Sequence, residues 1–366
     1  MSKQYIGVLL QRSLYRRLKE GKRKQIDIGF FEEAARKNNL IPCYFLVRNL
    51  AGRQDTAPAL VNNNGVFQEK IVEVPRVIYN RDWNMPSRQR IINQLTKQGI
   101  IVFNEKNYLR KYKFQAILED NKEFLRYLPE TKIASPQTLK EMMQKYHQLI
   151  LKPENGLRGR GIHKLQKLNK KEWKVSYKTE IGERGVWKEI IFSETIPEYL
   201  EQLIKKNTYL IQNFLPLATY HGSPFDLRVA TQRNRTGDWE VSAIIAKVAG
   251  EGSFLTNIEQ GGTSYTLNKI LEQYPHLNAE HVREQIVSLA IKIANLFSRH
   301  LPHIGDLGFD FAITPKGDLY YIECNFVSGY KGFTIKDGVL LHDEWKAVFT
   351  KPADYARFLL DDNFQN

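Results

Sequence analysis

The chain has 366 residues, 42% of them hydrophobic and 26% charged, a balance typical of a folded protein of two or three domains. Its 54 lysines and arginines exceed its 40 acidic residues, and the formal net charge of +14 attracts anionic partners. Two cysteines, no apolar run of about 20 residues and a strand-like start argue against a disulfide framework, a membrane span and a signal peptide. We therefore expect a cytoplasmic protein without a membrane partner.

Basic side chains crowd one early segment of the chain. They are Arg12, Arg16, Arg17, Lys19, Lys22, Arg23 and Lys24. The cluster suits either a patch for an acidic partner or a solvated helix and loop. We favour the solvated surface, because no aromatic stacking platform or nucleic-acid motif accompanies it. No nucleic-acid partner is expected.

The first hundred residues alternate between apolar runs and helical periods. Expected strands lie at 6–10, 42–47, 77–80 and 100–104, expected helices lie at 30–37 and 87–98, and residues 62–65 read as a turn. Such alternation predicts an α/β unit with a largely parallel sheet.

Further helices and strand pairs follow. We expect helices at 109–128, 135–147, 197–205, 278–300 and 345–360, the last broken near Pro352. We expect strands at 132–134, 149–152, 162–167, 173–178, 185–193, 227–233 and 239–248. Residues 209–215 form a short apolar segment. Ser135 and Asn278 are good N-caps, and Pro136 suits a first helical position. The helix after Asn278 repeats apolar residues on one face, which is expected to contact the core.

A hairpin near the C-terminus carries a pattern that suits a metal site. Asp310 ends one strand-like run, and a second run delivers Glu323, with Asn325 on the same face by period two. Three converging oxygen-bearing side chains are what Mg²⁺ takes from a protein when phosphate and water fill its other positions. A hairpin with solvated or salt-bridged carboxylates is the plain alternative.

The register of this hairpin depends on its turn. If Thr314 faces Leu319 across a turn centred between residues 316 and 317, antiparallel pairing sets Asp310 opposite Glu323. A slip of one residue would put the two carboxylates on opposite faces of the sheet. We therefore expect this turn alone to keep them together.

A glycine-rich segment follows the strand that ends at Lys152. Backbone amides of such a loop approach phosphate oxygens while the lysine supplies a point charge. Arg158 and Arg160 favour an anion over a mobile surface turn. The segment is not a P-loop, because it lacks the Gly-Lys-Ser/Thr ending and a strand follows it. Its glycines are Gly156, Gly159 and Gly161.

A second polar cluster combines Asp226 and Arg228 on one strand face with Lys247 on the paired strand. An arginine held on a strand can fork onto a phosphoryl or carboxylate group, oriented by a neighbouring carboxylate. The alternative is a cross-strand salt bridge of little energetic worth. A loop at 256–264 contributes further polar and glycine positions, among them Asn257, Gly261 and Gly262.

The order of these features resembles the ATP-grasp superfamily from about residue 109 to 330. The ordered features are Lys111, Lys152 with its glycine-rich hairpin, the apolar hinge with Gln212, Asp226-x-Arg228, Asn257 with Gly261-Gly262, and Asp310 followed by Glu323-x-Asn325. More narrowly, other segments resemble the YheC/YheD-like branch, described as endospore-coat-associated. They are Val77-Ile78-Tyr79-Asn80-Arg81, Phe103-Asn104, Tyr127-Leu128-Pro129-Glu130-Thr131 and a tail with Pro352, Tyr355, Ala356, Arg357 and Phe358.

This resemblance implies a fold class and a division of the chain. The class is α/β, with α+β lobes in the ATP-grasp module. An N-terminal α/β pre-ATP-grasp domain would cover 1–108, a nucleotide lobe 109–212, a second lobe with the metal site 213–335, and a helical tail 336–366.

The resemblance also implies site residues for ATP and for Mg²⁺ or Mn²⁺. The metal ligands would be Asp310, Glu323 and Asn325, and the phosphates would be bound by Lys111, Lys152, Gly156, Gly159 and Gly161. Adenine would contact Gln212, Asn213 and Phe214. The catalytic cations would be Arg228 and Lys247, and the acceptor would contact Asp226, Asn257, Gly261 and Gly262. Two residues depart from the family pattern. Arg110 stands where many relatives have Asp, and Asn213 stands where a carboxylate often follows the hinge glutamine, which leaves ribose recognition open.

The implied activity is an ATP-dependent carboxylate–amine or carboxylate–thiol ligase that forms an acyl phosphate on a small-molecule or peptide carboxylate. Arg81, at a strand end in the first domain, is a candidate contact for the substrate carboxylate. Two alternatives stay open: an ATP-grasp kinase, and a non-catalytic or nucleotide-sensing spore-coat-associated protein. A homo-oligomer, frequent among similar ligases, and spore association stay open as well.

Overall fold

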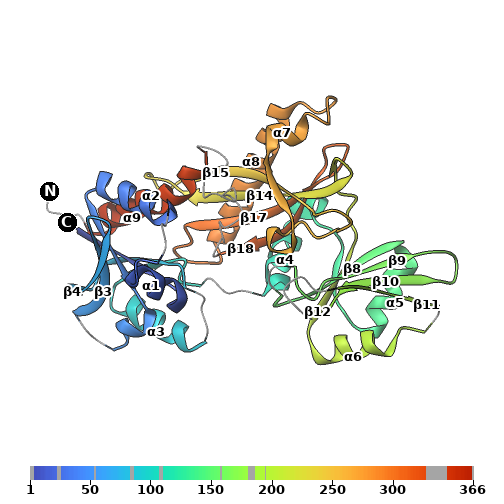
Figure 1. The fold of residues 1–366 in the computed structure, drawn as a ribbon, viewed down its shortest axis with the longest axis horizontal. Helices are drawn as coiled ribbons and strands as arrows, with labels where there is room; N and C mark the ends of the chain where they lie inside the picture. The colour runs from blue at the N-terminus through green and yellow to red at the C-terminus, as the bar shows by residue number, and fades with distance from the viewer. Residues whose placement is uncertain are drawn as a thin grey trace.

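Three sheets organise the chain in a computed structural model that describes residues 4–22, 26–52, 55–82, 86–106, 110–156, 159–179, 186–193, 195–326 and 344–364. Figure 1 shows them in a row, with the sheet of the last strands between the N-terminal sheet and the sheet that holds β8 to β12. No helix in these ranges is long and apolar enough to cross a bilayer.

The N-terminal sheet has the strand order β4-β3-β2-β1-β5-β6. Four neighbouring strands are parallel, as predicted: β1 (Gln4–Leu9), β2 (Leu40–Phe45), β5 (Val77–Asn80) and β6 (Ile101–Phe103). An antiparallel hairpin, which the sequence did not predict beyond its turn at 62–65, extends the edge with β3 (Thr56–Asn63) and β4 (Val66–Glu73). Most of β4 is exposed, so it carries little apolar signal. The helices of this domain are α1 (Arg12–Lys19), α2 (Ile26–Lys37) and α3 (Pro86–Lys97).

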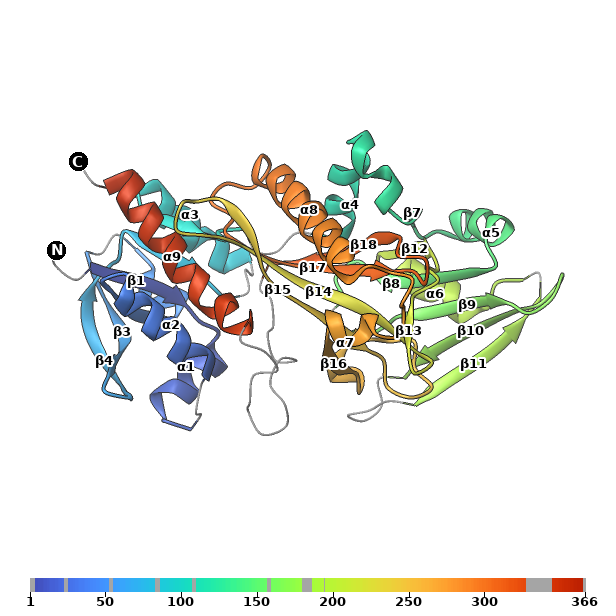
Figure 2. The same ribbon diagram turned by 90° about the horizontal axis from the view of Figure 1, so that it is seen from above.

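The C-terminal helix α9 (Glu344–Phe364) returns to the N-terminal sheet, as Figure 2 shows. Its residues Ala353, Ala356 and Leu359 belong to the core of that domain. The prediction of a break near Pro352 was wrong, because the helix continues through this residue.

A side chain from another domain explains how the helix tolerates the proline. Pro352 has no N–H for the carbonyl four residues earlier, that of Val348. The buried Gln232 supplies the missing donor, because its Nε2 lies 2.9 Å from the Val348 oxygen. The backbone acceptor is therefore satisfied where the helix continues through the proline.

Replacing Gln232 with leucine is expected to lower the free energy of unfolding by about 1–3 kcal/mol, because the Val348 carbonyl would be buried without a donor. A second change, Pro352→Ala, restores a backbone N–H and should recover most of that loss. Urea unfolding of the single and double variants measures both effects. An equal loss with and without proline would contradict this role of Gln232.

The sheet at the other end is antiparallel throughout, in the order β11-β10-β9-β8-β12-β7. Its strands are β7 (Thr131–Ile133), β8 (Gln148–Pro153), β9 (His163–Lys167), β10 (Trp173–Lys178), β11 (Trp187–Phe192) and β12 (Tyr209–Asn213). Helices α5 (Pro136–Lys145) and α6 (Glu198–Lys206) pack on one face. The predicted cap of α5 is confirmed, with Thr138 N–H donating to Ser135 Oγ and proline at the first turn.

The middle sheet has the order β16-β15-β14-β17-β18, with β13 (Thr219–Tyr220) beside β14. Its strands are β14 (Ser223–Arg233), β15 (Trp239–Val248), β16 (Thr263–Thr266), β17 (Asp306–Ile313) and β18 (Leu319–Asn325). Helix α8 (Ala279–Ser298) covers one face, beside the short α7 (Leu267–Leu271). Its predicted cap, Asn278, and its core-facing stripe are confirmed.

The predicted helix at 109–128 is two elements where the structure describes it. α4 (Lys111–Glu119) ends before Asn121, whose extended backbone starts the 3-10 helix at Lys122–Tyr127. The Asn121 side chain donates to the Ile117 carbonyl, which competes with continued helix formation. Lys111 therefore begins a helix of its own, which ends at Glu119.

Asn104 joins the first domain to the middle sheet. Its Nδ2 donates to the carbonyls of Asp306, at 2.8 Å, and Phe326, at 3.0 Å. Its Oδ1 accepts from the N–H groups of Gly305 and Asp306. The side chain is almost fully buried, so this hub fixes how the first domain meets the start of β17.

The register of the C-terminal hairpin corrects one prediction and confirms another. Ile313, not Thr314, pairs with Leu319, so the turn is centred on Lys316 and the pairing next to it differs by one residue from the prediction. A β-bulge between Asp310 and Phe311 leaves Ile322 as an extra residue and restores the pairing of Asp310 with Glu323. The expectation that one turn alone keeps the carboxylates together was wrong, because a bulge compensates for the slip.

Candidate functional site

Three distant parts of the chain meet where the middle sheet approaches β8. Lys111 begins α4, Lys152 lies in β8 and Glu323 lies in β18. The Nζ of Lys111 is 2.6 Å from Glu323 Oε2. The Nζ of Lys152 lies 3.5 Å from the carbonyl of Ile322, the residue that the bulge adds. The bulge therefore both restores the carboxylate pairing and turns a backbone oxygen towards a lysine.

Lys152 is a buried cation held by neutral groups. Its Nζ donates to Gln212 Oε1 at 3.2 Å, and Gln212 Nε2 donates to Thr131 Oγ1 at 2.7 Å. Burial, together with the nearby charge of Lys111, lowers the pKa of Lys152 to about 8. Among the described residues, no carboxylate lies within ion-pair distance of the Lys152 ammonium group.

Glu323 is surrounded by positive charge. Burial opposes ionisation of this carboxyl, but the ammonium groups of Lys111, Lys152 and Lys247 outweigh it and hold the pKa of Glu323 far below its usual range. Asn325 Nδ2 donates to Glu323 Oε1 at 3.3 Å, which places the two predicted metal ligands side by side.

A second ionic cluster lies across β14, β15 and β17. Arg228 donates two hydrogen bonds to Asp310, from Nε to Oδ1 at 2.5 Å and from Nη2 to Oδ2 at 3.1 Å. Lys247 Nζ bridges Asp310 Oδ2, at 3.2 Å, and Asp226 Oδ1, at 3.0 Å. Thr256 Oγ1 donates to the other oxygen of Asp226 at 2.5 Å. Burial raises the pKa of Asp226, against the attraction of Lys247.

The strand register explains why these charges gather. Glu323, Asp310 and Arg228 are partners across three neighbouring strands, and Asp226 pairs with Lys247 in the adjacent row. Residues two apart on one strand share a face, so Asp226 and Arg228 point the same way. The pattern Asp-x-Arg therefore places both side chains on the face opposite the one that α8 covers.

The glycine-rich hairpin touches the loop predicted to line the acceptor side. Gly159 and Gly161 both have φ of +70°, and a Cβ on Gly159 would lie 2.5 Å from Asn257 Oδ1. The positive φ favours glycine at both positions, and a side chain on Gly159 would displace the Asn257 amide. Arg158 lies outside the described residues. The contact brings two predicted site segments together across the two lobes.

The loop that follows β15 is itself tightly folded. A Cβ on Gly262 would lie 2.6 Å from the Thr256 carbonyl oxygen, and Gly261 has φ of +98°. Gln260, beside them, accepts a bond of 2.9 Å from Lys178 of β10. The contact with Gly159 and the bond from Lys178 therefore both hold this loop against the part of the chain that carries β8 to β12.

The predicted adenine hinge, residues 209–215, consists of β12 and the two residues that follow it. The N–H of Asn213 donates to the Glu130 carbonyl and that of Phe214 to the Gln148 carbonyl. These two amides are thus engaged within the protein. The Asn213 side-chain oxygen is buried and, in the described structure, accepts no hydrogen bond.

Arg81 does not join the charge clusters. It follows β5, and its guanidinium lies over the ring of Tyr79, 5.8 Å from the centroid. Tyr79 donates its hydroxyl to Asp306, the first residue of β17, whereas Asp310 lies in the middle of that strand. The structure therefore places Arg81 beside Tyr79, after β5 and apart from the charge clusters.

Some site residues were not predicted as such, although Thr131 lies in a segment that carries the YheC/YheD resemblance. Thr131 orients the Gln212 amide, and Ile322 offers its carbonyl to Lys152. Neither residue type is diagnostic of a site. Thr256 lies in the loop at 256–264, whose polar residues were expected near the site. Its hydrogen bond to Asp226 was not predicted.

Comparisons with known proteins agree with this geometry. The chain matches the family described as YheC/D like ATP-grasp over residues 99–359. Two relatives from Bacillus subtilis (strain 168) are endospore coat-associated protein YheD, 27% identical over 317 residues (84% of this chain, 68% of the relative), and YheC, 21% identical over 291 residues (79% and 78%).

A solved structure shares the fold over nearly the whole length. The ATP-grasp ligase PsnB, complexed with a phosphomimetic variant of minimal precursor, Mg and ADP, has a TM-score of 0.55 at 12% identity, covering 97% of this chain and 98% of that one. Another structure of PsnB contains precursor peptide PsnA2 and AMPPNP. The predicted ATP-grasp fold class is therefore confirmed.

Proposed function

This chain belongs to the YheC/D-like ATP-grasp family, and on that premise we propose that it is an ATP- and Mg²⁺-dependent carboxylate–amine ligase that acts through an acyl phosphate. ATP is the nucleotide that this fold implies. The proposed substrates are an amino-acid or peptide carboxylate and an amine.

The observation that carries the proposal is an excess of buried positive charge. The four cations of the site are Lys111, Lys152, Arg228 and Lys247, and its three carboxylates are Asp226, Asp310 and Glu323. A buried charge without a partner is costly, so the site is suited to an anion. Lys152 is the cation without an ion pair, and a phosphate oxygen would complete its surroundings. A triphosphate has the charge that this cluster lacks.

The side chains present fit a divalent cation. Asp310 and Glu323 are register partners, and the Asn325 amide lies against Glu323, so carboxylate and amide oxygens share one face. Such oxygen donors suit Mg²⁺ or Mn²⁺. When bound, the ion would neutralise phosphate charge. Lys111, now paired with Glu323, lies where it can contact a phosphate oxygen instead.

A buried acceptor supports a ligand at the hinge as well. Buried polar atoms in proteins usually have a hydrogen-bond partner. The Asn213 side-chain oxygen, which has none within the described residues, is available to a donor such as the adenine amino group or a ribose hydroxyl.

The chemistry needs no protein nucleophile. An oxygen of the substrate carboxylate attacks the γ-phosphorus and ADP leaves; the amine then attacks the acyl carbon, loses a proton, and inorganic phosphate leaves. Arg228 and Lys247 would stabilise negative charge on the phosphoryl group during both steps. Positioning and charge neutralisation supply the catalysis.

Phosphate release tests the proposal. With Mg²⁺ and ATP, phosphate should appear only when both a carboxylate and an amine are present, and Glu323→Ala should remove the activity because it deletes a proposed metal ligand. Amino acids and short peptides form the screen, and Glu201→Ala, at an exposed ion pair on α6, is the matched control.

Three other outcomes would count against this function. Transfer of phosphate to a single substrate without phosphate release would indicate a kinase. Absence of AMPPNP binding by calorimetry with Mg²⁺ would favour a non-catalytic role, such as the spore-coat association in the names of the two Bacillus relatives. Full activity in Glu323→Ala would refute the metal assignment.

A further inference from the structure

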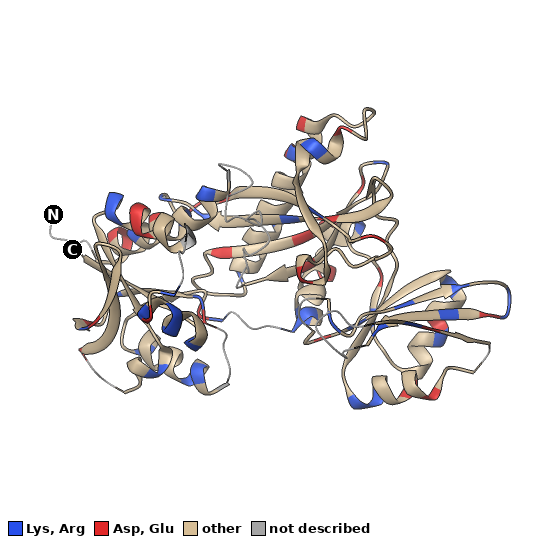
Figure 3. Ribbon diagram, in the orientation of Figure 1, with Lys and Arg blue, Asp and Glu red and all other residues tan. Residues whose placement is uncertain are grey.

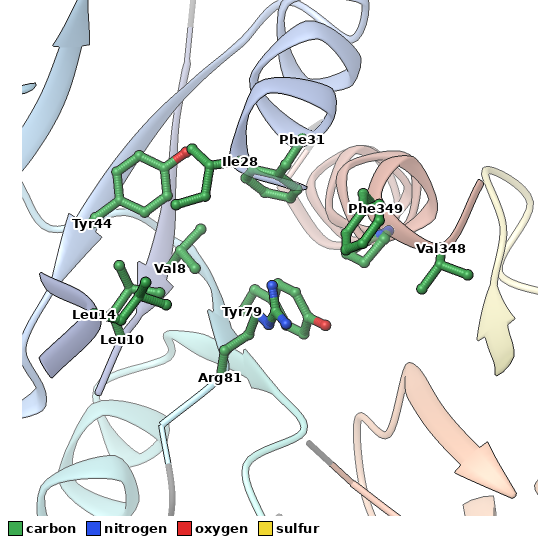
Figure 4. A pocket seen from close by; sticks show the side chains of 11 residues that line it. Val8, Leu10, Leu14, Ile28, Phe31, Tyr44, Tyr79, Arg81, Val348 and Phe349 are labelled. Carbon is green, nitrogen blue, oxygen red and sulfur yellow. The ribbon is translucent and has the colours of Figure 1, made fainter. Parts of the chain in front are cut away.

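The first domain is closely packed inside and open along one edge. The apolar pocket between α2, α9 and the N-terminal sheet, which Arg81 lines, has room for only about one water molecule (Figure 4). The outer edge of the sheet is different. β4 is its last strand, and within the described ranges no strand pairs with the side of β4 that faces away from β3. Figures 1 and 2 show β4 on the outside of the molecule, at the end remote from β8 to β12.

β4 lacks the features that usually protect an edge strand. It is eight residues long, it contains no proline, and its pairing with β3 has no bulge. Short length, proline and bulges are among the devices that keep edge strands from pairing with other chains. Two large apolar side chains of β4 also point into solvent, Val66 with 60% of its surface exposed and Ile71 with 69%. A row of free backbone N–H and C=O groups beside such side chains is a template for another strand.

The side chains of β4 divide between the two faces of the sheet. Phe67, Glu69 and Ile71 share one face, where Phe67 packs against the core that α1 and α2 cover. Val66 and Val72 share the other face, where Val72 belongs to the core that α3 covers. Each face of β4 therefore has one apolar residue at the edge of a core and one exposed apolar residue.

Pairing of β4 with a second β4 fits these residues in one register. A two-fold axis normal to the sheet makes the strands antiparallel and pairs only residues that share a face. When Glu69 lies on the axis, Ile71 faces Phe67 of the second copy, and Val66 faces Val72 of the second copy. Each exposed apolar side chain then meets one at the edge of a core. A shift of two residues in either direction would set Glu69 opposite Ile71 or opposite Phe67, a charge against an apolar side chain.

The charged residues of β4 fit the same register. Lys70 faces the amide of Gln68 of the second copy, whose oxygen can accept a hydrogen bond from the ammonium group. The two Glu69 carboxylates face each other at the axis, but each pairs with Lys19 of its own α1. Two carboxylates and two ammonium groups therefore meet there, and their charges cancel. Figure 3 shows basic residues on α1, the helix that supplies this lysine.

We propose that the chain forms a two-fold symmetric dimer through β4, in which the N-terminal sheets of two copies join edge to edge into one continuous sheet. The partner on this edge is a second copy of the chain, because the register that matches apolar to apolar residues is a self-pairing one. β4 lies at the end of the molecule remote from the charge clusters, so both candidate sites stay open. The inference does not depend on the proposed ligase function.

Another edge strand with an exposed apolar residue lacks this complementarity. β11 ends the sheet that holds β8 to β12, and its Ile191 is 61% exposed. With Glu189 on a two-fold axis, Lys188 would face Ile190 of the second copy. With Ile190 on the axis, Glu189 would face Ile191, and with Lys188 on the axis the two lysines would meet. β11 therefore provides a matched control for β4.

Light scattering after size-exclusion chromatography, at several protein concentrations, tests the dimer. At about micromolar concentration the protein should have twice the mass of the 42.7-kDa chain. Ile71→Lys should raise the dissociation constant at least about a hundredfold, because symmetry repeats the change and sets each lysine against Phe67 of the other copy. The control Ile191→Lys should leave the mass unchanged. Both residues are exposed, so the unfolding temperature should stay the same in both variants.

Cross-linking tests the register. Glu69→Cys should form a disulfide-linked dimer under mild oxidation, because directly opposed Cα atoms lie about 4.5–5.5 Å apart. Lys70→Cys should not, because its counterpart in the second copy is a diagonal neighbour, about 7–8 Å away. Electrophoresis without reducing agent measures both. Wild-type protein, oxidised in parallel, controls for Cys43 and Cys324.

Several results would overturn the proposal. One is a wild-type mass that stays at that of a single chain at every concentration, as it would if β4 pairs with a different polypeptide. Another is a dimer that survives Ile71→Lys or is lost in Ile191→Lys, since the interface would then lie elsewhere. If Ile71→Lys fails to fold, Val66→Lys on the other face of β4 repeats the test. Cross-linking of Lys70→Cys without Glu69→Cys would refute the register. None of these results bears on phosphate release, so they leave the proposed function untouched.

Discussion

Replacing Lys152 with methionine is expected to weaken nucleotide binding by about a hundredfold while making the folded protein more stable. The lysine is buried beside neutral acceptors, so its charge costs stability in the free protein. Methionine has a similar length and no charge. Removing the buried charge should stabilise the folded protein by up to about 3 kcal/mol. Losing the hydrogen bond to the Gln212 amide should destabilise it by only about 1 kcal/mol.

The pH dependence has a definite sign. The pKa of Lys152 falls from 10.5 to about 8 on folding, so between these values the unfolded chain binds the proton and the folded chain does not. The contribution of Lys152 to the free energy of unfolding therefore rises with pH between about 8 and 10.5. In the free protein the lysine also loses its charge there, so affinity for AMPPNP should fall as pH rises through about 8.

Calorimetry with AMPPNP and urea unfolding, each at several pH values, measure these effects. The matched control is Lys188→Met, an exposed lysine of β11 in the same lobe, which should change neither quantity. A variant Lys152→Met that loses stability yet keeps its nucleotide affinity would show that the lysine is structural. The assignment of Lys152 to phosphate would then be wrong.

Replacing Asp310 with leucine should lower the free energy of unfolding by about 3–5 kcal/mol and remove phosphate release. Asp310 is the shared partner of Arg228 and Lys247, and its side chain is 4% exposed. Its loss leaves the arginine without a counter-ion and the lysine with Asp226 alone. Urea unfolding reports the stability, and phosphate release reports the activity.

A double variant separates the structural role of Asp310 from its chemical role. Asp310→Leu with Arg228→Met removes the charge pair together and replaces it with apolar side chains, which should restore most of the stability. Activity should remain absent, because both a proposed metal ligand and a proposed catalytic cation are gone. Recovery of activity with stability would mean that neither residue takes part in the reaction.

The local elements of the fold could be predicted because their signals are local. Parallel strands, the caps at Ser135 and Asn278 and the stripe on α8 follow from periodicity and from the hydrogen-bonding capacity of single side chains. The edge strand β4 could not, because its mostly exposed residues lack an apolar period.

The site was only partly predictable for the same reason. Strand periodicity predicted that Asp226 and Arg228 share a face, because residues two apart on a strand point the same way, whereas Lys111 and Lys152 were expected at the site only from the family resemblance. Which cation pairs with which carboxylate was not readable. Lys111 and Glu323 are far apart in the sequence and meet only when β18 reaches α4.

The sequence by itself determined the α/β first domain, the ATP-grasp order of motifs and the hairpin that carries Asp310 and Glu323. Tertiary structure decided that a bulge at Ile322 restores this pairing and that Gln232 lets α9 continue through Pro352. It also decided that Arg81 lies at an apolar pocket and not among the reaction cations. Local patterns depend on neighbours in the chain, whereas these features depend on hydrogen bonds and charges that distant segments bring into contact.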